Sequence, residues 1–179
     1  DLVDLAKRHI DTSLTIADGG VKVGAKYGEP NVTRHIETEQ FLELLAWYIT
    51  EGNVYSADTG NHRVKIAQED DTHRDEIRNI LEEVVDYCYT SDRYVQCSSR
   101  VLGDLLQELC GSGSANKRIP ELVFEASQKQ KERFLQVLID GDGDRQENSW
   151  RYSTKSKQLR DDVLRLCTHL GLTASYGSD

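Results

Sequence analysis

Two stretches of the chain are apolar along most of their length and end in an acidic residue followed by glycine. In the first, Phe41–Gly52, the acidic residue is Glu51, and in the second, Phe134–Gly143, it is Asp142. Apolar runs of this length predict buried helices. A glycine just past the last turn is typical of a helix end, because glycine adopts the left-handed cap conformation with little strain.

A carboxylate at this end of a helix is unfavourable by about 0.3–1 kcal/mol, because the end already carries partial negative charge. The chain repeats the arrangement, with Glu51 and Asp142 at equivalent positions. Such a repeat predicts two copies of one unit whose helices face each other. Two neighbouring carboxylates repel unless they share a proton or a metal ion, so we expect a shared divalent-cation site.

The remaining patterns predict further helices and strands. Thr38 is the expected N-cap of the first apolar helix, and Asn53–Ala57 and His62–Ala67 alternate as a hairpin about a turn at Asp58–Asn61. Further helices are expected at Thr72–Tyr87, Ser99–Cys110, from Pro120, from near Ser127 and at Lys157–Leu170. Further strands are expected at Arg93–Ser98, Ser149–Thr154 and Leu172–Tyr176, with a polar turn at Asp144–Asn148.

The first part of the chain has weaker patterns. Residues 1–11 have apolar spacing that suits a short helix, whereas the glycines and proline of residues 12–36 favour strands or loops with weak preferences. No apolar run approaches the roughly 20 residues of a membrane span, and no signal peptide opens the sequence. We therefore expect a soluble, cytoplasmic protein.

The net charge of −9 argues against nucleic acid as a ligand, because DNA affinity depends on Lys and Arg meeting phosphates. A basic sheet face can nevertheless coexist with acidic helices. Arg outnumbers Lys, methionine is absent and acidic residues are plentiful, a composition similar to that of proteins from salt-loving archaea. The four cysteines show no CxxC spacing, so we expect core residues rather than a zinc site.

Leu44–Gly52 and Leu135–Gly143 resemble the two LAGLIDADG motifs of a homing endonuclease of the DOD type, the kind found inside inteins. Asn116–Pro120 resembles the block between the two motifs in that family, and Tyr152–Leu159 and Val163–Leu172 resemble the family's sequence after the second motif. The resemblance covers about residues 35 to 176. Each motif alone is a loose pattern, but four in the right order are a strong signal.

The resemblance implies a mixed α/β fold of two pseudo-symmetric αββαββα units. Their motif helices would pack at the centre, and their antiparallel sheets would form a saddle over DNA. We expect a linker or extension at residues 1–36, the first unit at 37–126, and a second unit at 127–179 that is short or truncated. Small residues are expected where the motif helices cross; Ala46 and Thr50 fit this expectation, whereas Gln136 and Val137 are bulky.

The implied function is site-specific cleavage of both strands of a long DNA target, which initiates the spread of an intein or intron. Glu51 and Asp142 fall on the catalytic acids that would hold Mg²⁺, and Lys117 falls on the active-site lysine. Lys155 and Lys157 are candidates for a second lysine. Candidate DNA contacts lie on the expected strands and near the second motif: Arg63, Lys65, Arg93, Gln96, Arg151, Thr154 and Lys155. We expect a monomer that binds double-stranded DNA, with any splicing domain attached outside these residues.

Three alternatives bear on this interpretation. Asp140, Asp142 and Asp144 mimic the start of a calcium loop, but Arg145 and Arg151 occupy the positions where that loop needs Gly and Glu. A catalytically decayed relative that binds DNA or assists RNA splicing would share the motifs and the short second half. An unrelated acidic α/β interaction module would bind no DNA at all.

Overall fold

The structure is a computed structural model that describes residues 12–17, 20–25, 34–56, 62–147 and 149–177. The helix expected at residues 1–11 and the turn expected at Asp58–Asn61 lie outside the described residues. Within the described part of the chain, no helix is long and apolar enough to cross a membrane.

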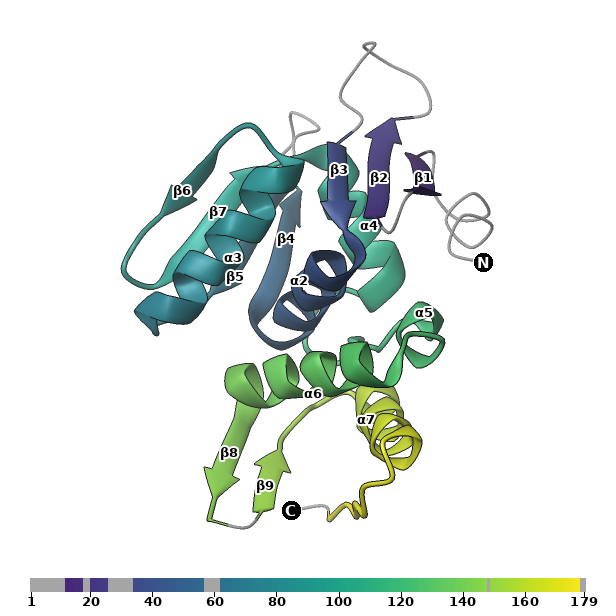
Figure 1. Cartoon of the computed structure of the whole chain (residues 1–179). Coiled ribbons are helices and arrows are strands. Elements are labelled where there is room, and N and C mark those ends of the chain that lie inside the picture. Colours follow the sequence, from purple (N-terminus) through teal and green to yellow (C-terminus); the bar gives the residue numbers. More distant parts are fainter. Residues whose placement is uncertain (1–11, 18–19, 26–33, 57–61, 148, 178–179) are drawn as a thin grey trace.

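Two long helices, α2 (Thr38–Glu51) and α6 (Gln128–Asp142), lie side by side at the centre of the molecule (Figure 1). Residues on every side of α2 are buried, among them Leu44, Leu45, Ala46, Trp47 and Tyr48. A helix that is apolar all round must be covered all round. Contacts with α6 and with the rest of the first unit provide this cover.

The first unit follows the predicted order of two helix-and-hairpin repeats closed by a third helix. After α2 come β4 (Gly52–Ser56), β5 (His62–Ala67), α3 (Asp71–Val84), β6 (Cys88–Thr90), β7 (Tyr94–Ser98) and α4 (Arg100–Cys110). The strands form one antiparallel sheet in the order β4-β5-β7-β6. This unit is a complete αββαββα repeat, as expected from the sequence.

One face of this sheet carries the core, and the other is open. Val64, Ile66 and Val95 are fully buried against helices α2, α3 and α4. The residues between them, such as Lys65 and Gln96, lie on the opposite face and stay partly exposed. An antiparallel sheet with one packed face commonly presents the other to solvent or to a ligand.

The second unit is shorter. It consists of α6, β8 (Gly143–Gln146), β9 (Ser149–Tyr152) and α7 (Lys157–His169), with the short helix α5 (Glu121–Phe124) before it. Figure 1 shows the β8–β9 hairpin on the side of α6 away from the four-stranded sheet. The second strand pair and third helix of the first unit have no counterpart among the described residues of the second.

Two predictions for this unit are wrong. Asp144–Asn148 was expected to be a polar turn, but β8 extends to Gln146, because its backbone pairs with β9 from Gly143–Tyr152 to Gln146–Ser149. Polar composition does not prevent pairing when both strands are largely exposed. Leu172–Tyr176 was expected to be a strand, but these residues form no strand in the structure and are exposed.

Before α2, the chain forms a three-stranded antiparallel sheet of β1 (Thr12–Ala17), β2 (Gly20–Ala25) and β3 (Arg34–Glu37). This agrees with the strand alternative predicted for the region. β2 contacts α4, and β3 contacts α3 and leads directly into α2. Thr38, predicted as the N-cap of α2, is instead its first helical residue, and Glu37 is the N-cap.

The two glycines that end α2 and α6 are not left-handed, contrary to expectation. Gly52 has φ −87° and Gly143 has φ −91°, so both are extended and lead straight into a strand. Glycine is needed there for space. A Cβ at Gly52 would lie 2.6 Å from the carbonyl oxygen of Tyr48, and a Cβ at Gly143 would lie 2.5 Å from that of Ile139.

Candidate active site

A cleft of about 560 Å³ opens where α2 and α6 both end. Its lining comes from the helix ends, the segment that contains Lys117, and the start of the connection after β9. The lining residues are Ile49, Thr50, Glu51, Gly52, Asn53, Gly113, Ser114, Lys117, Asp142, Ser153, Thr154, Lys155 and Leu159. The structure thus brings Glu51, Asp142 and Lys117, all predicted as site residues, to one cleft.

The close approach of the two helices brings the acids together. Gly141, one residue before Asp142, faces Thr50, one residue before Glu51. A Cβ built on Gly141 would lie 2.5 Å from Thr50 Oγ1, which leaves no room for any larger residue. The Thr50 hydroxyl donates to the carbonyls of its own helix, to Trp47 O at 3.1 Å. The helices therefore touch at the last turn, and their acidic ends come directly after it.

The electrostatics of the cleft disfavour two negative charges. Burial and then the charge of Glu51 raise the pKa of Asp142 to about 6, although the residue is exposed at the cleft and Lys117 opposes the shift. Burial also raises the pKa of Glu51. Without a cation, the Asp142 carboxyl therefore keeps its proton to a higher pH in this cleft than it would in water.

Lys117 is buried, with 4% of its surface exposed. Its Nζ donates to the carbonyl oxygens of Tyr48 at 2.6 Å and Gly52 at 2.9 Å, and lies 3.3 Å from the centre of the Tyr48 ring. Burial lowers the pKa of Lys117 to about 8, despite the neighbouring Cys110 and Asp142. The ammonium thus supplies the positive charge that the C-terminal turn of α2 lacks in its own sequence.

Hydrogen bonds fix the segment that carries Lys117. The Ser156 hydroxyl donates to Lys117 O at 2.6 Å, and the backbone N–H of Ile119 donates to the carboxylate of Asp162 at 2.9 Å. Both partners belong to α7 or its N-cap. On the other side, Tyr48 donates its hydroxyl to Gly111 O at 3.0 Å. The lysine is therefore held between α2 of the first unit and α7 of the second.

The donor set suits a hard divalent cation. Carboxylate oxygens are the ligands that Mg²⁺ prefers, and Mg²⁺ is usually held by one or two carboxylates together with waters and substrate phosphates. No group of three or more His, Cys, Asp or Glu side chains that could hold a metal occurs among the described residues. Glu51 and Asp142 could thus hold a cation whose remaining ligands come from water and substrate.

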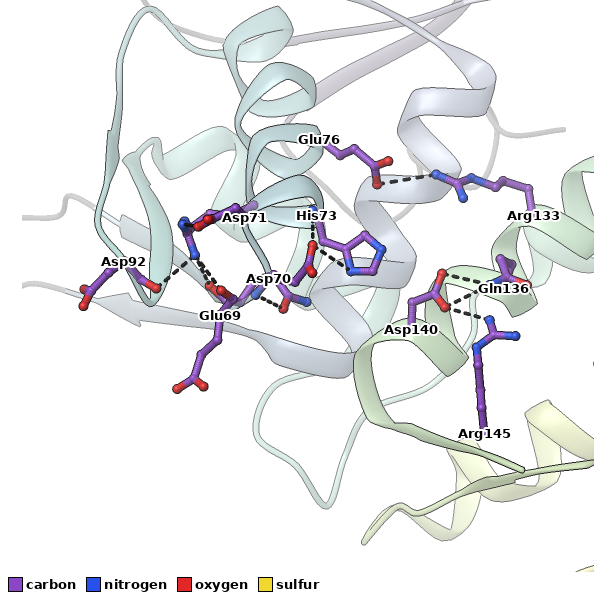
Figure 2. Close-up of polar contacts among 12 residues, drawn as sticks. Glu69, Asp70, Asp71, His73, Glu76, Asp92, Arg133, Gln136, Asp140 and Arg145 are labelled. Carbon is purple, nitrogen blue, oxygen red and sulfur yellow. Dashed lines mark hydrogen bonds and ion pairs between the residues drawn. The ribbon is translucent and has the colours of Figure 1, made fainter. Parts of the chain in front are cut away.

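Asp140 lies only one half-turn of helix from Asp142, but its carboxylate is paired with other side chains. Its carboxylate accepts hydrogen bonds from Gln136 at 2.9 Å and from Arg145 at 2.7 Å (Figure 2). A carboxylate paired in this way is not free to bind calcium together with Asp142 and Asp144. This pairing gives a structural reason, besides the unsuitable sequence positions, against a calcium loop.

A second set of ion pairs joins the two units in the N-terminal halves of the helices, and Figure 2 shows one of these pairs, between Arg133 and Glu76. Arg133 of α6 donates to both carboxylate oxygens of Glu43 in α2, at 3.0 and 3.1 Å, and lies 3.6 Å from Glu76 in α3. Paired geometry of this kind fixes orientation as well as adding stability. Arg133 thus helps hold α6 in register with α2.

The open face of the four-stranded sheet begins at the cleft. Cross-strand register aligns Asn53 of β4, Lys65 of β5, Gln96 of β7 and Tyr89 of β6 in one row across all four strands. Lys65 Nζ lies 3.8 Å from the centre of the Tyr94 ring on the same face. Arg63 and Tyr55 pair in the neighbouring row and are exposed. Asn53 and the tyrosines were not among the predicted contacts, although strand alternation could have indicated them.

The other predicted contact residues occupy different places. Arg93 was expected on a strand, but it lies in the turn between β6 and β7, outside the row of Lys65 and Gln96. Thr154 also lies outside a strand; its hydroxyl accepts from the backbone N–H of Ser156. Arg151 is exposed on β9, whereas Lys155 lines the cleft. Lys157 begins α7, is exposed and is absent from the cleft lining.

Tyr152 lies next to the cleft-lining residue Ser153, and the sequence did not single it out. It ends β9 and pairs with Gly143, the residue after Asp142. Burial, then the charges of Asp142 and Glu51, raise the pKa of its hydroxyl. No sequence signal separates this tyrosine from the others, because its burial arises only from the hairpin's position on α6.

Comparison with known proteins shows which sequences and solved structures this chain is similar to. The sequence model of the LAGLIDADG-like domain matches residues 129–178. The chain is 29% identical over 143 residues to a DNA polymerase of Thermococcus sp. (strain GE8), a match covering 76% of this chain and 8% of the polymerase. It is 37% identical over 79 residues to a DNA gyrase subunit of Mycobacterium gordonae, covering 41% of this chain and 14% of the gyrase subunit. The chain therefore spans only a small part of these relatives.

The fold is similar to that of solved endonuclease structures. The crystal structure of I-DmoI in complex with DNA and Mn matches with a TM-score of 0.56 and 19% identity, covering 74% of this chain and 78% of that one. The crystal structure of I-DmoI in complex with DNA and Ca gives a TM-score of 0.55, also at 19% identity, covering 74% and 72%. Residues 129–178 are thus a LAGLIDADG-like domain, and the chain has the fold of the LAGLIDADG homing endonucleases.

Proposed function

We propose that this protein is a site-specific DNA endonuclease that makes a metal-dependent double-strand break in a long target. The observation that carries the proposal is the pair of acidic helix ends, Glu51 and Asp142, in one cleft with the buried ammonium of Lys117. A site with only two carboxylates needs further ligands, and phosphate oxygens from a substrate would supply them. Mg²⁺ is the cofactor we propose.

Each residue has a distinct chemical task in this proposal. The bound cation would polarise a phosphoryl oxygen and lower the pKa of bound water. Glu51 and Asp142, one at the end of each central helix, would hold it. Lys117 keeps a positive charge at the floor of the cleft, where negative charge develops during phosphodiester hydrolysis. Two of its N–H groups are bonded to carbonyls, which leaves one donor for the substrate.

The open sheet face is the proposed DNA-binding surface. Lys65 and Arg63 supply positive charge for phosphates, and Asn53 and Gln96 supply the side-chain amides that read adenine edges in the major groove. Asn53 belongs both to this row and to the cleft lining. The row therefore leads from base contacts directly to the site of cleavage. Arg151 and Lys155 would extend the surface on the second unit.

We further propose that the chain is an inserted segment of a larger protein, in the manner of an intein. Its matches cover 8% of a DNA polymerase and 14% of a gyrase subunit, two enzymes with unrelated tasks. A segment that is shared by otherwise different hosts is expected of a mobile element. A DNA endonuclease provides the means of such spread, because the break it makes in an empty site is repaired from the occupied copy.

The test is cleavage of a plasmid library carrying candidate empty insertion sites, with Mg²⁺ or Mn²⁺, at low and multimolar salt. Specific double-strand cleavage is expected for the wild type and is expected to be lost in Glu51→Gln and Asp142→Asn. Glu132→Gln, an exposed acid on α6, is the matched control and should cut normally. EDTA should abolish cutting. Equal cutting by all three variants would exclude the two-acid mechanism.

A second candidate is a relative that binds DNA without cutting it. The observation that favours it is the short second unit, which places no second buried lysine in the cleft among the described residues. Electrophoretic mobility shift with Ca²⁺ separates the two candidates. Specific binding without cutting in any metal or salt would establish the second one.

A further inference from the structure

Two of the four free cysteines lie directly opposite each other on neighbouring strands. Cys88 begins β6, and its backbone pairs with that of Cys97 on β7. Residues that are opposite each other in a ladder share one face of the sheet. Here it is the packed face, because Cys97 is also paired with the buried Val64 of β5. The other two cysteines lie elsewhere, on α4 and α7.

The hydrogen bonds of the β6–β7 ladder determine which kind of pair the two cysteines form. The Ser91 N–H donates to Tyr94 O at 3.0 Å, so these two residues are a hydrogen-bonded pair at the end of the hairpin. Bonded and non-bonded pairs alternate along an antiparallel ladder. Cys88 and Cys97 lie three pairs further along and are therefore a non-hydrogen-bonded pair.

The ladder on the other side of β7 agrees with this assignment. The Ser99 N–H donates to His62 O at 2.9 Å, so the backbone groups of Cys97 are directed toward β5 rather than β6. In a non-hydrogen-bonded pair the two Cα atoms are about 4.5 Å apart, the closer of the two spacings. A disulfide needs Cα atoms roughly 4.4–6.8 Å apart. The backbone is thus spaced for a disulfide without moving.

The two thiols differ in their chemistry. A side-chain hydrogen bond from Cys97 lowers the pKa of the Cys88 thiol below its ordinary value. The same contact, followed by burial, raises the pKa of the Cys97 thiol. The thiolate is the nucleophilic form of cysteine. Cys88 also lies on the edge strand of the sheet and is 8% exposed, against 3% for Cys97. We therefore expect Cys88 to react first, with a reagent no larger than a few atoms.

We propose that Cys88 and Cys97 are a modification site at which hydrogen peroxide forms a reversible disulfide across β6 and β7. The Cys88 thiolate attacks one peroxide oxygen and the O–O bond breaks, which leaves a sulfenic acid on Cys88 and releases hydroxide. The Cys97 sulfur then displaces the sulfenic oxygen as hydroxide and forms the S–S bond. The two thiol protons join the two hydroxides, so two thiols and one peroxide give one disulfide and two waters.

The cross-link fastens the free edge of the sheet without covering its open face. Tyr89 and Gln96, the neighbours of the two cysteines along the strands, lie on that opposite face. A disulfide stabilises a protein mainly by restricting the unfolded chain. The oxidised protein is therefore expected to unfold at a temperature about 5 °C higher than the reduced protein.

Peptide mapping tests the proposal, because Arg93 lies between the two cysteines and trypsin separates them. The folded protein is treated with an equimolar amount of hydrogen peroxide, unfolded, alkylated and digested without reduction. The expected product is peptide 79–93 linked to peptide 94–100, which separates on adding dithiothreitol. Cys110 and Cys167 should be recovered alkylated.

Two variants serve as controls in the same experiment. Cys97→Ala leaves Cys88 without a partner, so it should give neither the linked peptides nor the rise in unfolding temperature. The double variant Cys110→Ala, Cys167→Ala removes the two other buried cysteines and keeps the pair. It should form the linked peptides to the same extent as the wild type.

Recovery of Cys88 and Cys97 fully alkylated after peroxide treatment would overturn the proposal, as would a disulfide that includes Cys110 or Cys167. A cross-linked protein that unfolds at a lower temperature than the reduced one would also overturn it, because the native backbone would then not accommodate the bond. None of these measurements uses DNA or a metal ion. The disulfide is therefore tested separately from the proposed endonuclease activity, and either can fail alone.

Discussion

At the scale of single residues, the ammonium of Lys117 is held by the last carbonyls of α2 rather than by a carboxylate. This arrangement leaves the charge of Asp142 free for a cation and keeps a positive charge at the floor of the cleft. Lys117→Met removes that charge. We expect the single-turnover rate of DNA cleavage to fall about 10²–10³-fold, the usual effect of losing one donor to a developing charge.

The control for this variant is Lys129→Met, which changes an exposed lysine on α6. It should cut at the wild-type rate. Circular dichroism must show that Lys117→Met remains folded, because the two carbonyls lose a donor. A folded Lys117→Met protein that cuts at the wild-type rate would contradict the role proposed for this lysine.

The ionised carboxylate of Asp142 is expected to lower the free energy of unfolding, because the cleft disfavours its charge. The folded state raises its pKa to about 6, so it binds a proton more tightly than the unfolded chain does. The free energy of unfolding therefore falls as pH rises from about 4 to 6 and stays low above that. Asp142→Asn should be more stable than the wild type by about 1 kcal/mol at pH 7.5, allowing for solvent screening of this exposed group.

Urea unfolding at pH 7.5 and pH 4 measures this effect. The advantage of Asp142→Asn should become small at pH 4, where the carboxyl is largely protonated in the folded wild type and about half protonated in the unfolded chain. Added Mg²⁺ should narrow the difference at pH 7.5 because the cation stabilises only the wild type. An Asp142→Asn protein that is less stable than the wild type at pH 7.5 would show that this carboxylate is structurally satisfied without metal.

At the scale of elements, the contact between α2 and α6 positions both acids through one glycine. Gly141→Ala would place a Cβ 2.5 Å from Thr50 Oγ1 and 2.7 Å from Thr50 Cβ. The helices must then separate, which should cost about 1–3 kcal/mol of stability, as overpacking usually does. Cleavage should fall as well, because the acids at the ends of the two helices move apart.

A double-mutant cycle with Thr50→Gly isolates this contact. Thr50→Gly alone should cost about 1 kcal/mol, as glycine does within a helix. Thr50→Gly removes the side chain that Gly141→Ala would clash with. The loss of stability in the double variant should therefore be smaller than the sum of the two single losses by at least about 0.5 kcal/mol. Additive effects in urea unfolding would mean that Gly141→Ala acts through something other than the helix contact.

At the scale of the whole molecule, a chain with net charge −9 is proposed to bind DNA through one local basic surface. The affinity for DNA should then fall steeply as the salt concentration rises, because each contact with a phosphate releases counterions from the DNA. Lys65→Met should reduce the slope of log K against log salt concentration by about 1 and leave sequence preference unchanged. Lys129→Met should leave the slope unchanged. Fluorescence anisotropy with labelled DNA in Ca²⁺ measures both.

The sequence alone determined the central features of this protein. Apolar runs ending in acid-glycine predicted α2 and α6, and the repeat of that pattern predicted that Glu51 and Asp142 would meet. Local periodicity was sufficient because helices and hairpins depend on neighbours close in the chain. The same local reasoning was wrong for Gly52 and Gly143, where space for a Cβ rather than a left-handed backbone requires glycine.

The tertiary structure decided what depends on residues far apart in the sequence. Pairing with β9 made β8 a strand despite its polar residues, and the turn after β6 removed Arg93 from the row of Lys65. The burial of Lys117 against carbonyls 69 and 65 residues earlier in the chain could not be seen in any local pattern. Nor could the burial of the Tyr152 hydroxyl. Side-chain type and spacing specify elements, whereas burial, pairing and charge in a site arise only when distant elements pack together.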